Sequence, residues 1–119
     1  MFFRMEAEGN VTEIYVQGDL TAATLPEFRN TVEPFLTGYQ RPIVLDFTEV
    51  NFISSAGIRA ILLLYRTAME AAPKYNLHFM DMIKFRNLSP HVDQIFDISG
   101  LNDSIIQWMR ERDEFHANK

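Results

Sequence analysis

The sequence contains no cysteine, and this absence excludes disulfide bonds and thiolate metal sites. It also has no long hydrophobic run, because the longest, residues 60–65, is far shorter than the roughly 20 residues that a membrane-spanning helix needs. The amino-terminal stretch, MFFRMEAEGN, lacks the apolar segment of a signal peptide. These absences predict a cytoplasmic protein that does not insert into a membrane.

Basic residues are also few. The chain has 11 Lys and Arg against 16 Asp and Glu, a formal net charge of -5, so a broad basic surface for nucleic acid is not expected. Catalytic and metal-binding patterns are missing too, since the sequence has no G-x-S-x-G, H-E-x-x-H, G-x-G-x-x-G or Walker A motif. The sequence therefore predicts a protein that is not an enzyme and that holds no metal or cofactor.

What the chain does have is enough apolar sequence for one core. Hydrophobic residues make up 47% of its 119 residues, and a chain of this length usually forms one domain. We expect a single domain over residues 1–119, with its core in about residues 2–110. The carboxy-terminal stretch, RERDEFHANK, is expected to be a mostly solvated tail.

The first half of the sequence predicts a hairpin, a helix and a strand. Residues 2–7 and 12–17 alternate in polarity around Gly9-Asn10, which is typical of two strands joined by a tight turn. Thr24-Leu25-Pro26-Glu27 has the spacing of a capping box before a helix, which Pro34 is expected to kink or end early. Residues 43–45 form a continuous apolar run, typical of a strand covered on both faces, and Asp46 is expected to mark its end.

The second half predicts helices alternating with strands. A helix is expected from the serines at positions 54 and 55 to Pro73, a strand over residues 75–82, and a helix from Pro90 to near Ser99. Residues 104–108 are expected to form a short last strand, followed by a final helix. The fold class is therefore α/β: a mixed sheet with an amino-terminal hairpin and about four helices packed on it.

The stretch NFISSAGIR places two serines and a glycine where a buried strand gives way to a helix. One interpretation is structural: Ser54 is the helix N-cap, and Gly57 allows close packing onto the sheet. The other is functional, because the positive end of a helix can accept a phosphate on Ser54 or Ser55 without loss of the fold. The residues alone leave both interpretations open.

Three segments, in order, resemble the STAS domain, the family of bacterial anti-sigma factor antagonists. The segment IVLDFTEVNFISSAGIRAILLLYR is similar to the family signature, in which a strand ending in Asp is followed by D-S-S-G-L or S-S-A-G-L. VQGDLTAATLPEFRN and VDQIFDISGL resemble two further family segments, so the resemblance covers essentially the whole chain. It implies a STAS-type sheet and a protein that regulates by binding.

The resemblance also implies a mechanism, partner switching. In the family, the unphosphorylated protein binds an anti-sigma factor that is also a serine kinase, which frees the sigma factor for transcription. Phosphorylation breaks the complex, and a PPM-type serine phosphatase restores it. Aligned on Gly57, the phosphorylated serine corresponds to Ser55, with Ser54 as second choice.

The resemblance indicates which residues contact the partner. Asp19 and Asp46 match family acidic positions at strand ends near the serines, where they could orient the hydroxyl or the incoming kinase, and Asp46 is the better candidate because it follows a buried strand. The helix that begins at the serines is apolar over most of its circumference, which leaves a flank for a partner. The predicted partner-binding residues are Asp19, Asp46, Ser54, Gly57, Ile58 and Arg59.

Aligned on Gly57, this sequence departs from D-S-S-G at two positions: Ser54 stands in place of the aspartate, which is the main departure, and Ala56 in place of the second serine. An alternative function is therefore retained: a STAS subunit of a lipid-transporting ABC complex, which binds the ATPase of that complex without phosphorylation.

Overall fold

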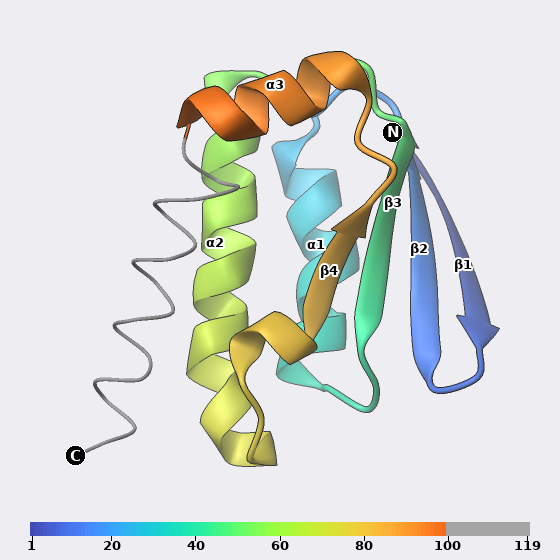
Figure 1. Ribbon diagram of the computed structural model, residues 1–119, viewed down its shortest axis with the longest axis vertical. Helices are drawn as coiled ribbons and strands as arrows, with labels where there is room; N and C mark the ends of the chain where they lie inside the picture. Colours follow the sequence, from blue (N-terminus) through green and yellow to red (C-terminus); the bar gives the residue numbers. More distant parts are fainter. Residues whose placement is uncertain (100–119) are drawn as a thin grey trace.

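The computed structural model describes residues 1–99, with side chains to residue 97. Four strands form one mixed sheet in the order β1-β2-β3-β4: β1 (Phe2–Glu8), β2 (Val11–Gln17), β3 (Ile43–Glu49) and β4 (Ile83–Arg86). Two helices, α1 (Leu25–Thr37) and α2 (Ser55–Ala71), lie side by side on one face of this sheet (Figure 1). A third, α3 (Pro90–Ser99), crosses one end of the molecule. The predicted α/β class is confirmed.

The predicted hairpin is also present. Strands β1 and β2 pair antiparallel from Phe2↔Gln17 to Glu8↔Val11, which leaves only Gly9 and Asn10 in the loop. Gly9 has a φ of 60°, a conformation that glycine adopts without the steric penalty of a side chain. Strand β2 then pairs parallel with β3, and β3 pairs parallel with β4, because α1 and α2 supply the crossover connections.

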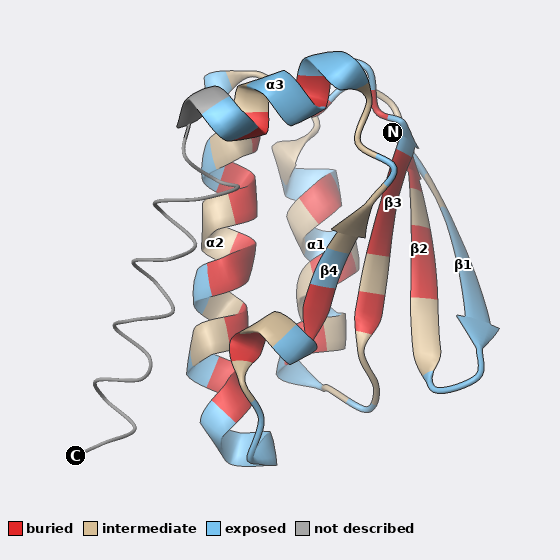
Figure 2. Ribbon diagram, in the orientation of Figure 1, coloured by how far each residue is buried: buried red, intermediate tan, exposed pale blue. Residues whose placement is uncertain are grey.

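The hydrophobic core fills the space between the sheet and the helices (Figure 2). The alternate residues Leu45 and Phe47 of β3 are fully buried, because successive side chains of a strand point to opposite faces. The Phe47 ring packs edge-on against Phe28 of α1 and Phe85 of β4, with ring centroids 6.3 and 5.2 Å apart. The same alternation places Asp46 on the sheet face opposite the helices. Within residues 1–99 no helix covers that face, so the prediction of a strand covered on both faces is wrong.

In the first half, the expected early end of the helix at Pro34 and the expected cap by Thr24 are both wrong. Helix α1 does not end early but continues past Pro34 to Thr37. Pro34 lies only one turn from the end, and Leu36, two residues later, is fully buried, so core packing holds that turn in place. The Thr24 side chain does not cap α1. Its hydroxyl instead donates to the Asp19 carbonyl at 2.7 Å and accepts from the Thr21 amide at 3.0 Å.

The strand predicted over residues 75–82 is also wrong. Two short 3-10 helices, η1 (Ala72–Tyr75) and η2 (Phe79–Asp81), occupy this part of the chain, and β4 begins only at Ile83. Asn76 separates them in a left-handed conformation with a φ of 57°. Phe79 and Met82 are both fully buried, and their spacing of three suits a helical turn better than a strand.

The strand and helix predicted after residue 103 lie outside the described residues. None of the helices in residues 1–99 has both the length and the apolar character needed to cross a membrane.

Candidate functional site

The loop after β2 lies against the start of α2. The Leu20 amide donates to the Phe52 carbonyl and the Ser54 amide donates to the Leu20 carbonyl, both at 3.0 Å. Leu20 and Ile53 form an isolated parallel bridge, and both side chains are buried. Asp19, next to Leu20 in the chain, is exposed. Tertiary structure therefore brings Asp19 into the neighbourhood of the serines, as predicted.

Ser54 is the N-cap of α2. Its backbone is extended, with φ -89° and ψ 176°, and its hydroxyl oxygen accepts from the Gly57 amide at 3.3 Å. The same hydroxyl lies 3.5 Å from the Leu20 carbonyl, to which it can donate. The structural interpretation of Ser54 is confirmed, because one otherwise unpaired amide of the first turn is satisfied.

Gly57 lies where α2 approaches the neighbouring loop most closely. A Cβ at this position would lie 2.5 Å from the Leu20 carbonyl oxygen and 2.6 Å from Cγ1 of Ile53, closer than real Cβ atoms approach other atoms. Only glycine fits here. Because Gly57 is buried, it positions the first turn of α2 and does not itself present a surface to a partner.

Ser55, by contrast, is exposed at the first position of α2. Arg59, also exposed, follows four residues later and therefore lies above Ser55 on the same face of the helix. Ile58 is half-buried against the core between them. The first turn of α2 carries no acidic residue. The structure thus gathers Ser55, Ile58 and Arg59 on one accessible flank at the positive end of a helix.

Phe52 is a candidate site residue that no pattern in the sequence indicated. This side chain is 45% exposed, immediately before Ile53, and its ring stacks on the exposed His91 of α3 with centroids 6.0 Å apart and an interplanar angle of 11°. An exposed aromatic residue beside an apolar flank is a typical anchor of a protein interface. We call Phe52, Ser55, Ile58, Arg59 and His91 the α2 face.

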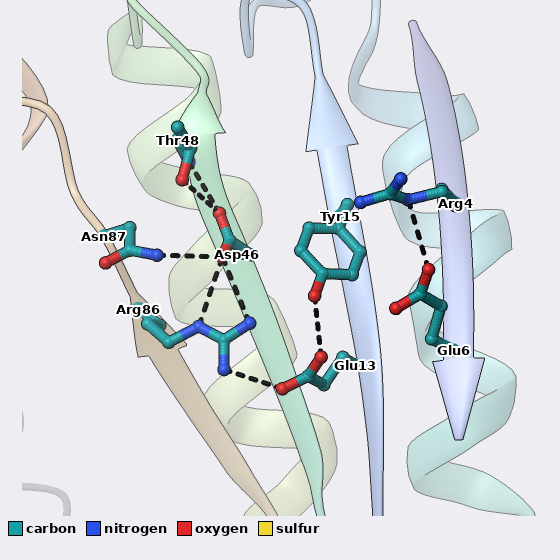
Figure 3. A network of polar contacts seen from close by, with 8 residues as sticks. All are labelled: Arg4, Glu6, Glu13, Tyr15, Asp46, Thr48, Arg86 and Asn87. Atoms are coloured by element: carbon teal, nitrogen blue, oxygen red, sulfur yellow. Dashed lines mark hydrogen bonds and ion pairs between the residues drawn. The ribbon is translucent and has the colours of Figure 1, made fainter. Parts of the chain in front are cut away.

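Asp46 belongs to a different part of the molecule from the one predicted. It is not at a strand end, because β3 continues to Glu49, and its side chain is only 4% exposed. Figure 3 shows its carboxylate on the open face of the sheet. Oδ1 accepts from the Thr48 hydroxyl at 2.6 Å and the Thr48 amide at 2.9 Å, while Oδ2 accepts from Asn87 at 2.9 Å and Arg86 Nε at 3.1 Å. These bonds hold the Asp46 carboxylate on the sheet.

Arg86 joins Asp46 to a second carboxylate. Its Nη1 donates to Glu13 Oε1 at 2.7 Å, and the Tyr15 hydroxyl donates to Glu13 Oε2 at 2.7 Å (Figure 3). Hydrogen bonds from Arg86 and Tyr15 lower the pKa of Glu13. Burial alone would raise the pKa of Asp46, but the hydrogen bonds from Thr48, Asn87 and Arg86 together outweigh it, so this pKa is also lowered. Both carboxylates are held in their charged form.

The buried acidic side chains on the open face of the sheet are already bonded to other residues of the described chain. In residues 1–99, no group of three or more His, Asp or Glu side chains is arranged to hold a metal ion. The buried acidic groups are bonded to Arg86, to hydroxyls and to an amide, and none of those bonds involves Ser54 or Ser55.

The cap makes a stability prediction for the two serines. Ser54→Ala is expected to lower the free energy of unfolding by about 1 kcal/mol, because the Gly57 amide loses its acceptor. The matched variant Ser55→Ala, at an exposed position, is expected to change it by less than about 0.5 kcal/mol. Urea denaturation of both variants measures the difference. Equal losses in the two would contradict the assignment of Ser54 as the cap.

Comparison with known proteins gives a consistent result. A family model described as "Mlab, STAS domain" matches residues 3–110. The BtrV protein of Bordetella bronchiseptica, which bears the name of an anti-sigma factor antagonist, is 28% identical over 85 residues. That match covers 71% of this chain and 66%, or just under two thirds, of the relative. The anti-sigma-B factor antagonist of Listeria monocytogenes is 23% identical over 113 residues, 95% of this chain and 91% of its own.

Solved structures share the fold. The anti-sigma factor antagonist SpoIIAA in its unphosphorylated form superimposes with a TM-score of 0.61 at 21% identity, over 84% of this chain and 82% of that one. The Bacillus cell fate determinant SpoIIAA in its phosphorylated form gives 0.58 at 22% identity, over 85% and 86%.

Proposed function

The chain belongs to the STAS domain family, and from this premise we propose that it is a protein-binding module controlled by phosphorylation of Ser55. The observation that carries the proposal is the division of work between the two serines. Ser54 is half-buried, and its hydroxyl oxygen accepts a hydrogen bond from the Gly57 amide of the first helical turn. Ser55 is exposed, and its side chain takes no part in the cap. Its modification therefore leaves the cap in place.

The partner in this proposal is an anti-sigma factor that is also a serine kinase. The named relatives support such a partner, since they are anti-sigma factor antagonists. The α2 face supplies the surface: Phe52 and Ile58 offer apolar contact, and Arg59 offers a positive charge. The unphosphorylated form binds, and the phosphorylated form is released and later restored by a PPM-type phosphatase.

The helix end explains how the fold tolerates the phosphate. Phosphorylation adds about -1.5 to -2 charge at neutral pH. The amino terminus of α2 carries partial positive charge, and its first turn contains no carboxylate that would repel the phosphate. Arg59, four residues on, is placed to pair with it. The related SpoIIAA has been solved both with and without phosphate, which supports a common fold for the two states.

Binding and not catalysis is the activity in this proposal. The chain is similar to anti-sigma factor antagonists, which are non-enzymatic regulators. Asp46 and Glu13, the buried carboxylates of the described residues, are both ion-paired to Arg86 on the open face of the sheet, and neither is hydrogen-bonded to Ser54 or Ser55.

The α2 face is tested by substitution. Phe52→Ala and Arg59→Ala are each expected to weaken binding to the kinase about tenfold or more, because interface anchors commonly contribute that much. The thermal midpoint should stay nearly constant, since both side chains are exposed. Calorimetric titration with the cognate serine kinase measures the effect.

The matched control is Arg66→Ala, at an exposed arginine two turns further along α2. It should bind as the unmodified protein does. If Arg66→Ala weakened binding as much as Arg59→Ala, the interface would not be centred on the start of the helix, and the α2 face would be wrongly assigned.

The second candidate function is the STAS subunit of a lipid-transporting ABC complex. It is favoured by Ser54, which replaces the aspartate of the D-S-S-G signature and serves here as a cap. Phosphopeptide mapping after incubation with the kinase separates the two. Phosphate on Ser55 supports partner switching, whereas an ATPase that binds the α2 face with no phosphorylation of either serine supports the subunit.

A further inference from the structure

Strand β1 leaves one long edge of the sheet open. Among the described residues it pairs with β2 alone, and six of its seven residues are exposed (Figure 2). Phe2 is 73% exposed and Met5 44% exposed. Within residues 1–99 no helix lies beyond this edge (Figure 1). Unpaired edges invite pairing with another strand unless bulges or unfavourable charges block it.

The hairpin determines which backbone groups of β1 face outward. Glu8 and Val11 close a two-residue loop, so they exchange hydrogen bonds with each other. In an antiparallel pair such residues alternate, and Arg4 and Glu6 therefore also direct their N–H and C=O groups toward β2. The groups of Phe3, Met5 and Ala7 point to the open edge. A strand added at this edge could form hydrogen bonds with the backbone groups of these three residues.

The charges along this edge are arranged so that those of one copy complement those of a second, antiparallel copy. Arg4 and Glu6 lie on the same face of the strand, on either side of Met5, with Arg4 Nε 3.7 Å from Glu6 Oε1 (Figure 3). If a second copy pairs antiparallel about a twofold axis at Met5, Arg4 of each copy stands opposite Glu6 of the other. Opposite charges directly across a ladder stabilise it, and here the contact occurs twice.

The backbone geometry agrees with this register. Met5 would exchange hydrogen bonds with Met5 of the second copy, and Phe3 with Ala7, using the outward groups. Arg4 and Glu6 would then form non-hydrogen-bonded pairs, in which side chains come closest. The two apolar side chains at Met5 would cover each other at the axis.

We propose that this protein forms a homodimer through antiparallel β1 pairing centred on Met5, which joins two sheets into one continuous sheet. The occupant is a second copy of this chain, because the alternation of charge around Met5 fits itself under twofold symmetry. The dimer is small in area and exchanges readily, as small interfaces do. It leaves the α2 face free.

Charge exchange tests the pairing in the full chain by sedimentation velocity over a range of concentrations. Arg4→Glu and Glu6→Arg are each expected to weaken dimerisation about tenfold or more, because both cross-strand pairs become like-charged. A mixture of the two variants should form a heterodimer, in which every pair is again opposite. The double variant Arg4→Glu/Glu6→Arg should recover the dimer. Arg66→Glu, a charge reversal at an exposed arginine of α2, is the control and should dimerise normally.

A cross-link tests the register. The chain has no cysteine, so a single introduced thiol reports one position without interference. Hydrogen-bonded partners lie about 5.5 Å apart between Cα atoms, within the range of a disulfide, so Met5→Cys should oxidise to a covalent dimer. Ala7→Cys, on the same edge, is the matched control: two copies of residue 7 would be more than about 13 Å apart, and no dimer should form.

A third variant separates loss of pairing from loss of folding. Met5→Pro removes an amide that faces the open edge, so the monomer should keep its far-ultraviolet spectrum and thermal midpoint while the dimer disappears. A chain that stays monomeric up to about 1 mM, a range that would reveal even millimolar affinity, would overturn the proposal. So would a dimer indifferent to charge reversal, or equal cross-linking of Ala7→Cys. If only a strand from another protein binds this edge, the second copy is not its occupant.

Discussion

A Ser55→Asp variant is expected to fold as the unmodified protein does and to bind the kinase partner roughly a hundredfold more weakly or worse. Ser55 is exposed at the positive end of α2, so a negative charge there is compatible with the fold. In the complex, however, the partner packed on the α2 face would have to remove water from that charge. The loss therefore falls on binding and spares stability.

Two serine variants make this prediction specific. Ser55→Ala should fold, bind and resist phosphorylation, because it keeps a small neutral side chain at the interface. Ser54→Asp should leave binding less affected, since Ser54 is half-buried in the cap and an aspartate can serve as an N-cap in its place. Calorimetric titration measures affinity, and thermal unfolding measures the fold. Unchanged affinity in Ser55→Asp would exclude Ser55 as the switch.

The second large effect concerns stability. Asp46→Ala is expected to lower the free energy of unfolding by about 3 kcal/mol, because a buried carboxylate that accepts bonds from Thr48, Arg86 and Asn87 is removed. The donors around it lose their acceptor while still partly shielded from water. Asp19→Ala, at an exposed aspartate, is the control and should cost less than about 0.5 kcal/mol. Equal costs in urea denaturation would show that the Asp46 contacts add nothing.

The same network predicts a dependence on pH. The pKa of Asp46 is lowered in the folded protein from its ordinary value of 3.8, so the unfolded chain takes up a proton first as the solution is acidified. The stabilisation is complete above that ordinary value and is lost as the pH falls through the lowered one. Glu13 acts in the same direction. Below about pH 4, stability should fall more steeply in the unmodified protein than in Asp46→Ala; parallel curves would argue against a paired carboxylate.

Much of the architecture follows from local patterns. The alternation around Gly9-Asn10 predicted the hairpin, and the apolar period after the serines predicted α2, which the structure places at Ser55–Ala71. These features depend on neighbours within a few positions, and such neighbours are visible in a sequence. Local patterns also misled, as at residues 75–82, where an apparent strand is two 3-10 turns because Phe79 and Met82 turn into the core.

The candidate site divides in the same way. That Ser54 caps a helix and that Gly57 lacks room for a side chain could be expected from nine residues, and the structure confirms the cap and the close contact with Leu20. That Phe52 stands exposed on His91 could not, because the stack requires α3 to return over the end of β3. Nothing within a few positions of Phe52 indicates where α3 will lie.

Sequence alone was enough for the fold class, the hairpin and the resemblance to the STAS family, because each rests on residue types at short spacing. It offered the Ser54 cap as one of two interpretations, which the structure then confirmed. Only the tertiary structure determined which charged side chains pair with one another. Arg86 reaches Glu13 across 73 positions and Asp46 across 40, so the chain had to form parallel pairs between β2, β3 and β4 before these three could meet. The pairing of β3 with β4 places Arg86 beside Asp46, so the Asp46 carboxylate is bonded on the open face of the sheet and not near the serines. An ion pair with an arginine on the neighbouring strand stabilises the charged carboxylate there.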